Sequence, residues 1–396
     1  MIRIAHIAAC LYLAGTTAAE TYTVCAVGCQ YTSINAAINA AEDGDTIQLF
    51  AETYYEGVPI DPDGKQITIL GTIDGGGSPT SVLDGNNTHR VLVCEHGETH
   101  DTRFISLSIE NGQSSGNGGG IYLEGSSPSF TGCEIKYNIS GYGGGGIYCD
   151  ASSPLIENCS IDHNDAGSSG GGIYSRNGSG PIIRDCSIAS NDAELDGGGV
   201  YLYGGNAWIR DCSLNGNKGR GGGIFCGYNC VLEIVDCNFH KNEGDGAGLY
   251  GYECDTSSII DCVFDLNESW NHGSAVFCNN YGASFENCHF TSNNYSSAIY
   301  IETGNSYPTF SNCIACNNDY AAQITGPYYG CFTCVAVDCD DCEIYGDVDG
   351  DGDADADDLI ALEASLGFCS TDNDRDGDTD IMDLLNVIAQ WGAICP

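Results

Sequence analysis

The sequence predicts an all-β solenoid, in which short strands wind into flat coils that stack on one another. Three observations carry this prediction: a motif that recurs eight times at intervals of 25 to 27 residues, glycine-rich stretches that disfavour helix, and apolar-aromatic pairs that favour strands. Each repeat is too short to bury its own apolar face. Neighbouring repeats must therefore stack to form one continuous core.

Two series of residues define the repeat. In the first, a Gly-rich run precedes an apolar residue and an aromatic one; in the second, a Cys is followed five residues later by Asn. Because coils of a solenoid place like residues on like, we expect each series to form a file along the stack. The inward Asn would bond the turn amides of neighbouring coils, and the inward Cys would pack as small apolar side chains without forming disulfides. The Cys series is Cys133, Cys159, Cys186, Cys212, Cys237, Cys262, Cys288 and Cys313, and the Asn series is Asn138, Asn164, Asn191, Asn217, Asn242, Asn267, Asn293 and Asn318.

The chain begins with a predicted signal peptide, residues 1–19. Arg3 supplies a basic start, residues 4–15 are mostly apolar, and residues 17–19 are small enough for cleavage. The rest of the sequence contains no run of 18 apolar residues, so it predicts no transmembrane helix. The 24 Cys residues suit an oxidising compartment. We therefore predict a secreted, extracellular or cell-surface protein. Lys plus Arg number 12 against 55 Asp plus Glu, so the net charge of -43 would repel nucleic acid and anionic membrane surfaces.

The first coil is predicted to be closed by a capping helix. Ile34, Ala37 and Ile38 share one face at helical spacing and can plug the open end of the stack, after which residues 46–49 form a strand. Residues 31–71 resemble the beginning of a right-handed parallel β-helix of the pectin-lyase-like superfamily. That fold hosts lyases, hydrolases, adhesins and plain scaffolds, so the resemblance implies a fold and not an activity.

The repeat spacing is also similar to that of leucine-rich repeats, whose outer side usually carries a helix. Here the outer stretches, such as 167–174 and 219–225, are glycine-rich and end in Ile-Tyr or Ile-Phe, which favours a β coil. We therefore predict a right-handed parallel β-helix of about twelve coils over residues 20–328. Repeats of chlamydial-type polymorphic outer-membrane proteins resemble the Gly-Gly-Gly-Ile runs and the Phe-x-x-Asn motifs at 239–242, 264–267 and 290–293.

Beyond residue 343, two twelve-residue loops have the spacing of an EF-hand calcium site. Carboxylates at positions 1, 3, 5 and 12 can surround one cation, position 7 offers a backbone carbonyl, and Gly at position 6 permits the sharp turn. Without metal the clustered carboxylates repel, so folding of this segment should need Ca²⁺. The predicted ligands are Asp347, Asp349, Asp351, Asp353 and Asp358 for one Ca²⁺, and Asp372, Asp374, Asp376, Asp378 and Asp383 for the second.

The acidic segment, residues 345–396, resembles the duplicated loop-helix of a type I dockerin, because no helix is predicted before either loop and position 12 is Asp. The resemblance implies an α-helical calcium-binding module that docks to a cohesin-like partner. At the positions that help choose the cohesin, Ala356-Asp357 and Ile381-Met382 differ from the usual hydroxyl-bearing pair. This departure puts a cellulosomal cohesin in doubt and leaves a calcium-dependent docking or anchoring role.

Several Cys residues outside the repeat series are expected to form disulfides. In the linker 329–344, Cys331, Cys334, Cys339 and Cys342 form paired C-x-x-C motifs, which can bind zinc. The gap between the pairs is shorter than in the usual zinc sites, so disulfides are the preferred prediction for an exported chain. Other expected pairs are Cys25 with Cys29, Cys230 with Cys254, and Cys369 with Cys395.

Carboxylates just before the Cys series are the catalytic candidates. Asp185 and Asp211 would stack one coil apart, which suits retaining glycoside hydrolysis, where two carboxylates about 5 Å apart are needed. Arg184 and Arg210 beside them could serve a lyase as base or as a clamp on uronate carboxylates. The same file also holds Asn158, and this exchange of Asp for Asn favours a turn-forming role over catalysis.

Two further sets are candidates for binding. If their apolar neighbours point inward, the aromatic residues of the repeat point outward and can stack on sugar faces; the alternative is ring-on-ring stacking that covers the solenoid. Cys94, His96 and His100 could ligate a metal, although a solvated turn is the simpler interpretation. The candidate sugar-binding rings are Tyr122, Tyr148, Tyr174, Tyr201, Tyr250 and Tyr300.

Three classes of function follow from these features. The preferred one is a β-helix that binds polysaccharide or a cell-surface protein along its long face and is docked by its calcium-dependent module. The second is a polysaccharide lyase or glycoside hydrolase, since dockerin-like segments usually accompany carbohydrate-active chains. The third is a structural, adhesin-like surface protein. The scarcity of basic residues argues against cleavage of an anionic uronate polymer.

Overall fold

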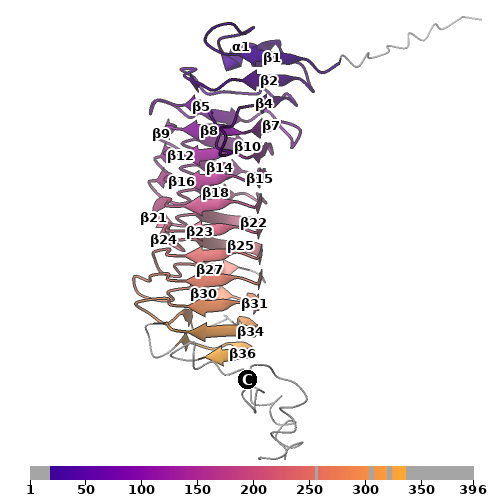
Figure 1. Cartoon of the computed structure of the whole chain (residues 1–396). Coiled ribbons are helices and arrows are strands. Elements are labelled where there is room, and N and C mark those ends of the chain that lie inside the picture. The colour runs from indigo at the N-terminus through magenta and orange to yellow at the C-terminus, as the bar shows by residue number, and fades with distance from the viewer. Residues whose placement is uncertain (1–17, 255–256, 303–306, 319–322, 336–396) are drawn as a thin grey trace, which may run out of the picture.

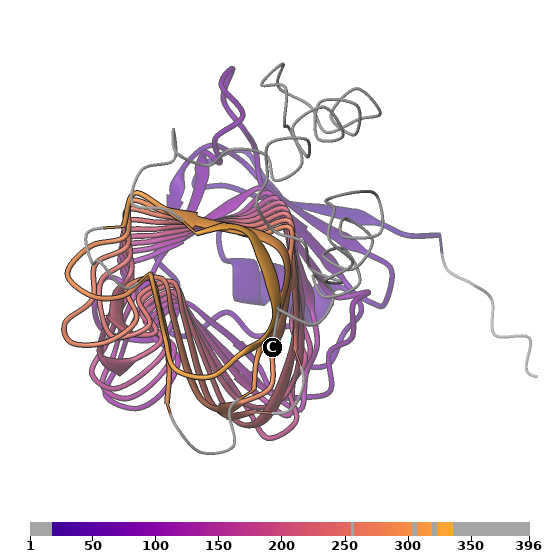
Figure 2. The ribbon, with the colours of Figure 1, turned by 90° about the horizontal axis from the view of Figure 1, so that it is seen from below.

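Strands of consecutive coils pair in parallel along the whole described part of the chain. The computed structural model describes residues 18–254, 257–302, 307–318 and 323–335. These residues wind into a β-helix of about 11 turns, one fewer than predicted (Figure 1). Seen along the axis, the strands of successive turns superpose around a common ring (Figure 2). The predicted stack of coils is therefore confirmed.

Three long ladders of parallel strands form the walls of the β-helix. The first, which contains the repeated aromatics, consists of β6 (Leu92–Cys94), β10 (Ile121–Glu124), β14 (Ile147–Asp150), β18 (Ile173–Arg176), the first part of β22 (Val200–Arg210), the first part of β25 (Ile224–Val235), β27 (Leu249–Cys254), β30 (Val276–Tyr281), β33 (Ile299–Ile301) and β35 (Ile324–Thr325). The second, which leads to the repeated Cys, consists of β1 (Thr21–Val24), β2 (Thr46–Leu49), β4 (Thr68–Leu70), β7 (Arg103–Ile105), β11 (Ser129–Thr131), β15 (Leu155–Glu157), β19 (Ile182–Arg184), the later parts of β22 and β25, β28 (Ser258–Ile260), β31 (Ser284–Glu286), β34 (Thr309–Cys316) and β36 (Tyr329–Val335).

A third ladder runs along the stack, and a short fourth one is present only in its middle turns. The third consists of β3 (Thr53–Tyr54), β5 (Ser81–Asp84), β8 (Leu107–Glu110), β12 (Glu134–Lys136), β16 (Ser160–Asp162), β20 (Ser187–Ala189), β23 (Ser213–Asn215), β26 (Asn238–His240), β29 (Val263–Asp265), β32 (His289–Thr291) and the later parts of β34 and β36. The fourth consists of β9 (Gln113–Ser114), β13 (Ile139–Ser140), β17 (Asp165–Ala166), β21 (Asp192–Asp196) and β24 (Lys218–Arg220).

The repeated Asn residues line up along one edge of the core. Asn191 is buried, and its side-chain oxygen accepts hydrogen bonds from the backbone N–H of Asn164, at 3.1 Å, and from that residue's Nδ2, at 3.0 Å. Its own Nδ2 donates to the carbonyl of Ile161, at 2.9 Å, and to Oδ1 of Asn217, at 3.0 Å. The same pattern links each Asn of the series to the next. The predicted file therefore satisfies turn amides that water cannot reach.

The Gly runs allow the coils to approach closely before the aromatic strand. A Cβ atom on Gly145 would lie 2.5 Å from the carbonyl oxygens of Asp165 and Gly171, closer than any side chain allows. Gly170 has φ +67°, a left-handed conformation that glycine adopts without steric cost. The glycine content of the sequence is therefore a packing requirement of the stack.

The predicted capping helix is confirmed as α1 (Ile34–Ala40). The side chain of Ser33 caps it by accepting a hydrogen bond from the N–H of Ala36, at 3.2 Å. Glu56 supports the same end, because its Oε1 accepts from the N–H of Ile34. Ile34 and Ile38 are buried on the face that closes the first coil. No helix in the described ranges is both long and apolar enough to cross a membrane.

Most cysteines of the described residues are buried free thiols, and a few are disulfide-bonded. Cys25 and Cys29 form the predicted disulfide. The eight Cys of the repeat are buried free thiols, as expected for small apolar packing groups. The predicted Cys230–Cys254 bridge is wrong, because both residues are free thiols. The thiol of Cys254 contacts that of Cys230 and also that of Cys226 in the preceding coil, whose sulfur is 2.9 Å away. The disulfides predicted for the linker and for the C-terminal module involve Cys residues whose side chains the structure does not describe.

We predict that Asn191→Ala destabilises the β-helix by about 1–3 kcal/mol, because the buried N–H of Asn164 loses its acceptor. Guanidinium denaturation followed by circular dichroism measures this change. The matched control is Asn215→Ala in the next coil, where the side chain is exposed and the change should stay within about 0.5 kcal/mol. Equal stability of the two variants would contradict a supporting role for the Asn file.

Candidate functional site

The outward aromatic residues of the first ladder stack on one another. Consecutive ring centroids from Tyr122 to Tyr300 lie 4.4–5.3 Å apart, with interplanar angles of 5–27°. Phe225 and Phe277 complete the column between the six candidate Tyr residues. Each ring face inside the column is thus occupied by a neighbouring ring, and Tyr148 is fully buried. The arrangement is the ring-on-ring alternative, and binding of a sugar to these residues stays a prediction.

Two phenols of this column, those of Tyr122 and Tyr250, have a raised pKa. Burial raises the pKa of Tyr250 to about 12. Burial, together with the hydrogen bond that its hydroxyl donates to Glu124 at 2.7 Å, raises the pKa of Tyr122 to about 12. The guanidinium of Arg90 lies over the Tyr122 ring, 4.6 Å from its centroid. The column therefore contributes apolar cover and cation–π contacts.

The predicted catalytic Asp residues lie in a file at a turn between the second and third ladders. Asp185 has φ 54° and Asp211 has φ 52°, both in the left-handed region. Asn158 and Gly132 occupy the same turn with φ values of 52° and 62°. Asp, Asn and Gly are the residues that adopt this conformation most readily. Backbone geometry therefore explains the residue types of the file without catalysis.

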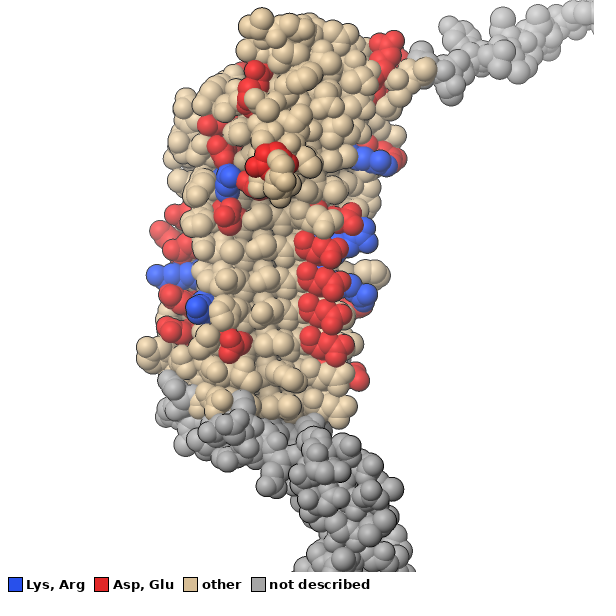
Figure 3. All heavy atoms as spheres, in the orientation of Figure 1, with Lys and Arg blue, Asp and Glu red and all other residues tan. Residues whose placement is uncertain are grey.

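The turn brings the two candidate Asp residues and the two candidate Arg residues onto one exposed edge of the β-helix. The N–H of Asp185 donates to the carbonyl of Arg210 in the next coil, at 3.1 Å, so Asp185 and Asp211 are one coil apart. Arg184 pairs in register with Arg210 and forms an ion pair with Glu157, at 2.8 Å. Figure 3 shows a file of Asp and Glu side chains along one edge of the β-helix. These charged groups are solvated and define an acidic border.

A hollow of about 280 Å³ lies on the outer surface of the second ladder. Strand alternation turns Ile209 inward and Trp208 outward, and the indole of Trp208 is 58% exposed. In the following coils the position of Trp208 is taken by Glu233, then by Ser258 and Ser284. The short serines beside a large ring leave the space open. Its polar and aromatic lining consists of Asn206, Trp208, Glu233, Ser257, Ser258 and Ser284.

The hollow borders the predicted Asp and Arg residues. Trp208 and Arg210 are two positions apart in β22, so both side chains leave the same face of the strand. Asp211 follows at the end of that strand. Sequence reasoning did not single out Trp208. The available signal was its place in the repeat, four residues before Cys212, where the other coils have only aliphatic, hydroxyl or acidic side chains.

The predicted metal set Cys94, His96 and His100 is not assembled. Cys94 is buried in the core, where burial raises the pKa of its thiol. The ring of His100 lies 2.9 Å from the carbonyl of Ser153. The ten predicted calcium ligands and the rest of residues 345–396 lie outside the described residues.

Parallel coils with an inward Asn file define a β-solenoid protein. The family model for the right-handed β-helix region matches residues 92–264 and 199–346. These matches together cover more than half of the chain, so the protein belongs to the right-handed β-helix family. No curated protein is significantly similar in sequence.

Solved structures with a similar fold include enzymes and a viral receptor-binding domain. The crystal structure of pectate lyase Pel9A has 15% sequence identity and a TM-score of 0.42, over 91% of this chain and 87% of that one. The Agl-KA catalytic domain has 14% identity and a TM-score of 0.35, over 76% and 64%. The Siphovirus 9NA tailspike receptor binding domain has 12% identity and a TM-score of 0.27, over 77% and 75%. None of these likenesses assigns an activity.

We predict that Asp211→Gly leaves stability nearly unchanged, whereas Asp211→Val lowers it by about 1–2 kcal/mol, because a branched side chain is strained at φ 52°. Denaturant unfolding of both variants tests this expectation. The matched control is Asn215→Val, an exposed strand position in the same coil, which should tolerate the branched residue. If Asp211→Val proved as stable as the parent protein, backbone conformation would not account for the Asp file.

Proposed function

We propose that this protein is an exported β-helix that binds a neutral polysaccharide in the hollow beside Trp208. The exposed indole carries the proposal, because a flat aromatic surface stacks on the apolar face of a sugar ring. Asn206, Ser258 and Ser284 add amide and hydroxyl groups that can bond sugar hydroxyls. Export is supported by the predicted signal peptide, residues 1–19.

Charge favours a neutral ligand over an acidic one. Glu233 lies in the hollow itself, and the Asp file runs along its border. Arg184, on the same border, is already paired with Glu157. The chain has 12 basic residues against 55 acidic ones, so a polyuronate would be repelled at close range. A cell-surface protein partner on the same face is the alternative binding function.

Hydrolysis is the second candidate function. The stacked positions of Asp185 and Asp211 support it, since neighbouring coils are about 4.8 Å apart and retaining glycosidases use carboxylates about 5 Å apart. A lyase would use Arg184 or Arg210 as base or clamp. An adhesin-like scaffold without a sugar ligand is the third candidate.

We predict that Trp208→Ala weakens polysaccharide binding about tenfold, which corresponds to about 1.4 kcal/mol of lost stacking. Affinity electrophoresis through gels that contain neutral or acidic polysaccharides measures the binding. The matched control is Trp270→Ala, since Trp270 is 51% exposed and lies outside the hollow lining. The parent protein should be retarded in at least one neutral gel.

Several outcomes would favour the other functions. Unchanged mobility of the parent protein in every gel would contradict polysaccharide binding and would favour the adhesin-like scaffold. Retardation that Trp208→Ala and Trp270→Ala share equally would place binding elsewhere. Release of reducing or unsaturated sugars, lost in Asp185→Asn or Asp211→Asn, would establish the enzyme. This release assay is run with and without Ca²⁺.

The C-terminal segment adds a proposed docking function. Ten Asp residues at the spacing of two calcium loops support binding of two Ca²⁺ ions by residues 345–396. The folded module would then anchor the β-helix to a partner, for which the dockerin resemblance suggests a cohesin-like protein.

We predict that removing Ca²⁺ unfolds this segment, because ten carboxylates repel one another without the metal. Limited proteolysis in EGTA should cleave beyond residue 343 and spare the β-helix, and Ca²⁺ should restore protection. The double variant Asp351→Ala and Asp376→Ala should be cleaved even with Ca²⁺. A surface control, Asp101→Ala, should behave as the parent protein. Cleavage that is independent of Ca²⁺ would contradict the module.

A further inference from the structure

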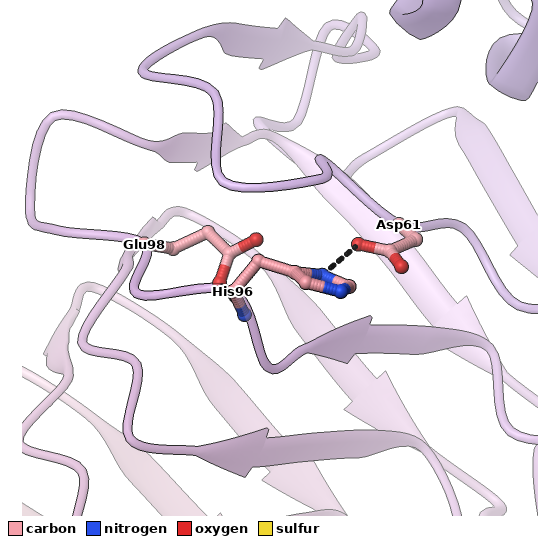
Figure 4. Close-up of side chains that lie close together, drawn as sticks. All are labelled: Asp61, His96 and Glu98. Carbon is pink, nitrogen blue, oxygen red and sulfur yellow. Dashed lines mark hydrogen bonds and ion pairs between the residues drawn. The ribbon is translucent and has the colours of Figure 1, made fainter.

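Three side chains with metal-binding atoms meet in loops of two neighbouring coils, several coils away from the hollow. Asp61 follows Ile60, which pairs in parallel with Leu92 of β6. His96 and Glu98 lie in the loop just after β6. Because paired parallel strands end at the same edge, the loops that follow them run side by side. Figure 4 shows the three side chains close together in these loops.

The distances suit one small cation. Nδ1 of His96 lies 3.6 Å from Oδ1 of Asp61, and the ligand atoms of all three residues lie within 4.8 Å of one another. Zinc binds nitrogen and carboxylate oxygen at about 2.0–2.2 Å in a tetrahedron, which places ligand atoms about 3.3–3.5 Å apart. Small side-chain rotations therefore bring the three atoms to coordination distance.

Glu98 is fixed in place before any metal binds. Its side chain is only 2% exposed. Oε1 accepts a hydrogen bond from the N–H of Gly64, at 2.8 Å, while Oε2 accepts from the N–H of His96, at 3.0 Å, and from the hydroxyl of Ser126, at 2.8 Å. Such outer contacts orient a ligand and are typical of metal sites. Oε1 accepts only one hydrogen bond and so keeps a lone pair for a cation.

The charges of the cluster are not balanced by protein cations. Within the described ranges, neither Asp61 nor Glu98 forms an ion pair with Lys or Arg. Two ionised carboxylates carry a charge of −2, which a divalent cation neutralises. His96 and Asp61 are part-exposed, so a metal can enter from solvent.

We propose that Asp61, His96 and Glu98 form a binding site for a divalent transition metal, with zinc as the best match. The imidazole nitrogen favours zinc over Ca²⁺ and Mg²⁺, which prefer oxygen ligands. Three protein ligands leave a fourth position for water. The site is independent of the two calcium loops and of the hollow beside Trp208.

Calorimetric titration of the full chain with Zn²⁺, in buffer saturated with Ca²⁺, tests the proposal. The parent protein should bind one more equivalent of zinc than His96→Ala and Asp61→Asn, or bind it at least about tenfold more tightly. Both changed residues are part-exposed, so circular dichroism should show an intact β-helix. The matched control is His163→Ala, which removes an exposed His that also lies beside an Asp, at 3.3 Å, and should keep the zinc site.

Titration with Co²⁺ identifies the ligands. Nitrogen and oxygen ligation gives weak visible bands that His96→Ala should remove, whereas strong sulfur-to-metal bands would place the cation on cysteines and overturn the proposal. Absence of zinc binding in the parent protein, or an identical titration in His96→Ala, would also overturn it.

Discussion

Hydrogen bonding between equivalent positions of consecutive coils governs this structure. In a parallel stack the neighbour of each residue is its own counterpart one turn away, about 4.8 Å along the axis. A residue type can therefore recur at one position of every coil only if it can stack on itself. Asn meets this condition inside the core, because its amide donates to one neighbour while its oxygen accepts from the other, as Asn191 does between Asn164 and Asn217.

The same constraint separates repeated residues from functional ones. The Gly runs, the aromatic column and the left-handed Asp file recur because the backbone and the stacked neighbours demand them. A ligand needs the opposite, a place where one coil differs from the next. Trp208, which is followed at the same position by Glu233 and then Ser258, is such a place on the outer wall. His96 beside Asp61 is another in the first, less regular coils.

Much of the fold could be predicted because a repeat reports the same contact many times. The Asn file, the free core cysteines and the capping helix around Ile34 and Ile38 were all readable from spacing. The candidate functional site was harder to predict from the sequence. Asp185 and Asp211 were found as a file, but only the positive φ values explain why Asp, Asn and Gly alternate there. The predicted Cys230–Cys254 bridge is wrong because the repeat spacing does not reveal that a third thiol, that of Cys226, lies against Cys254.

The sequence by itself determined the coil length, the residues that face the core and the family of the fold, because all three follow from local periodicity. The tertiary structure alone decided which outward groups are usable. It buried the faces of the aromatic column against each other, left Trp208 exposed in a hollow that short serines of later coils keep open, and joined Asp61 to His96 and Glu98 from a neighbouring coil. These outcomes depend on side-chain volumes and directions in adjacent turns, which no single repeat encodes.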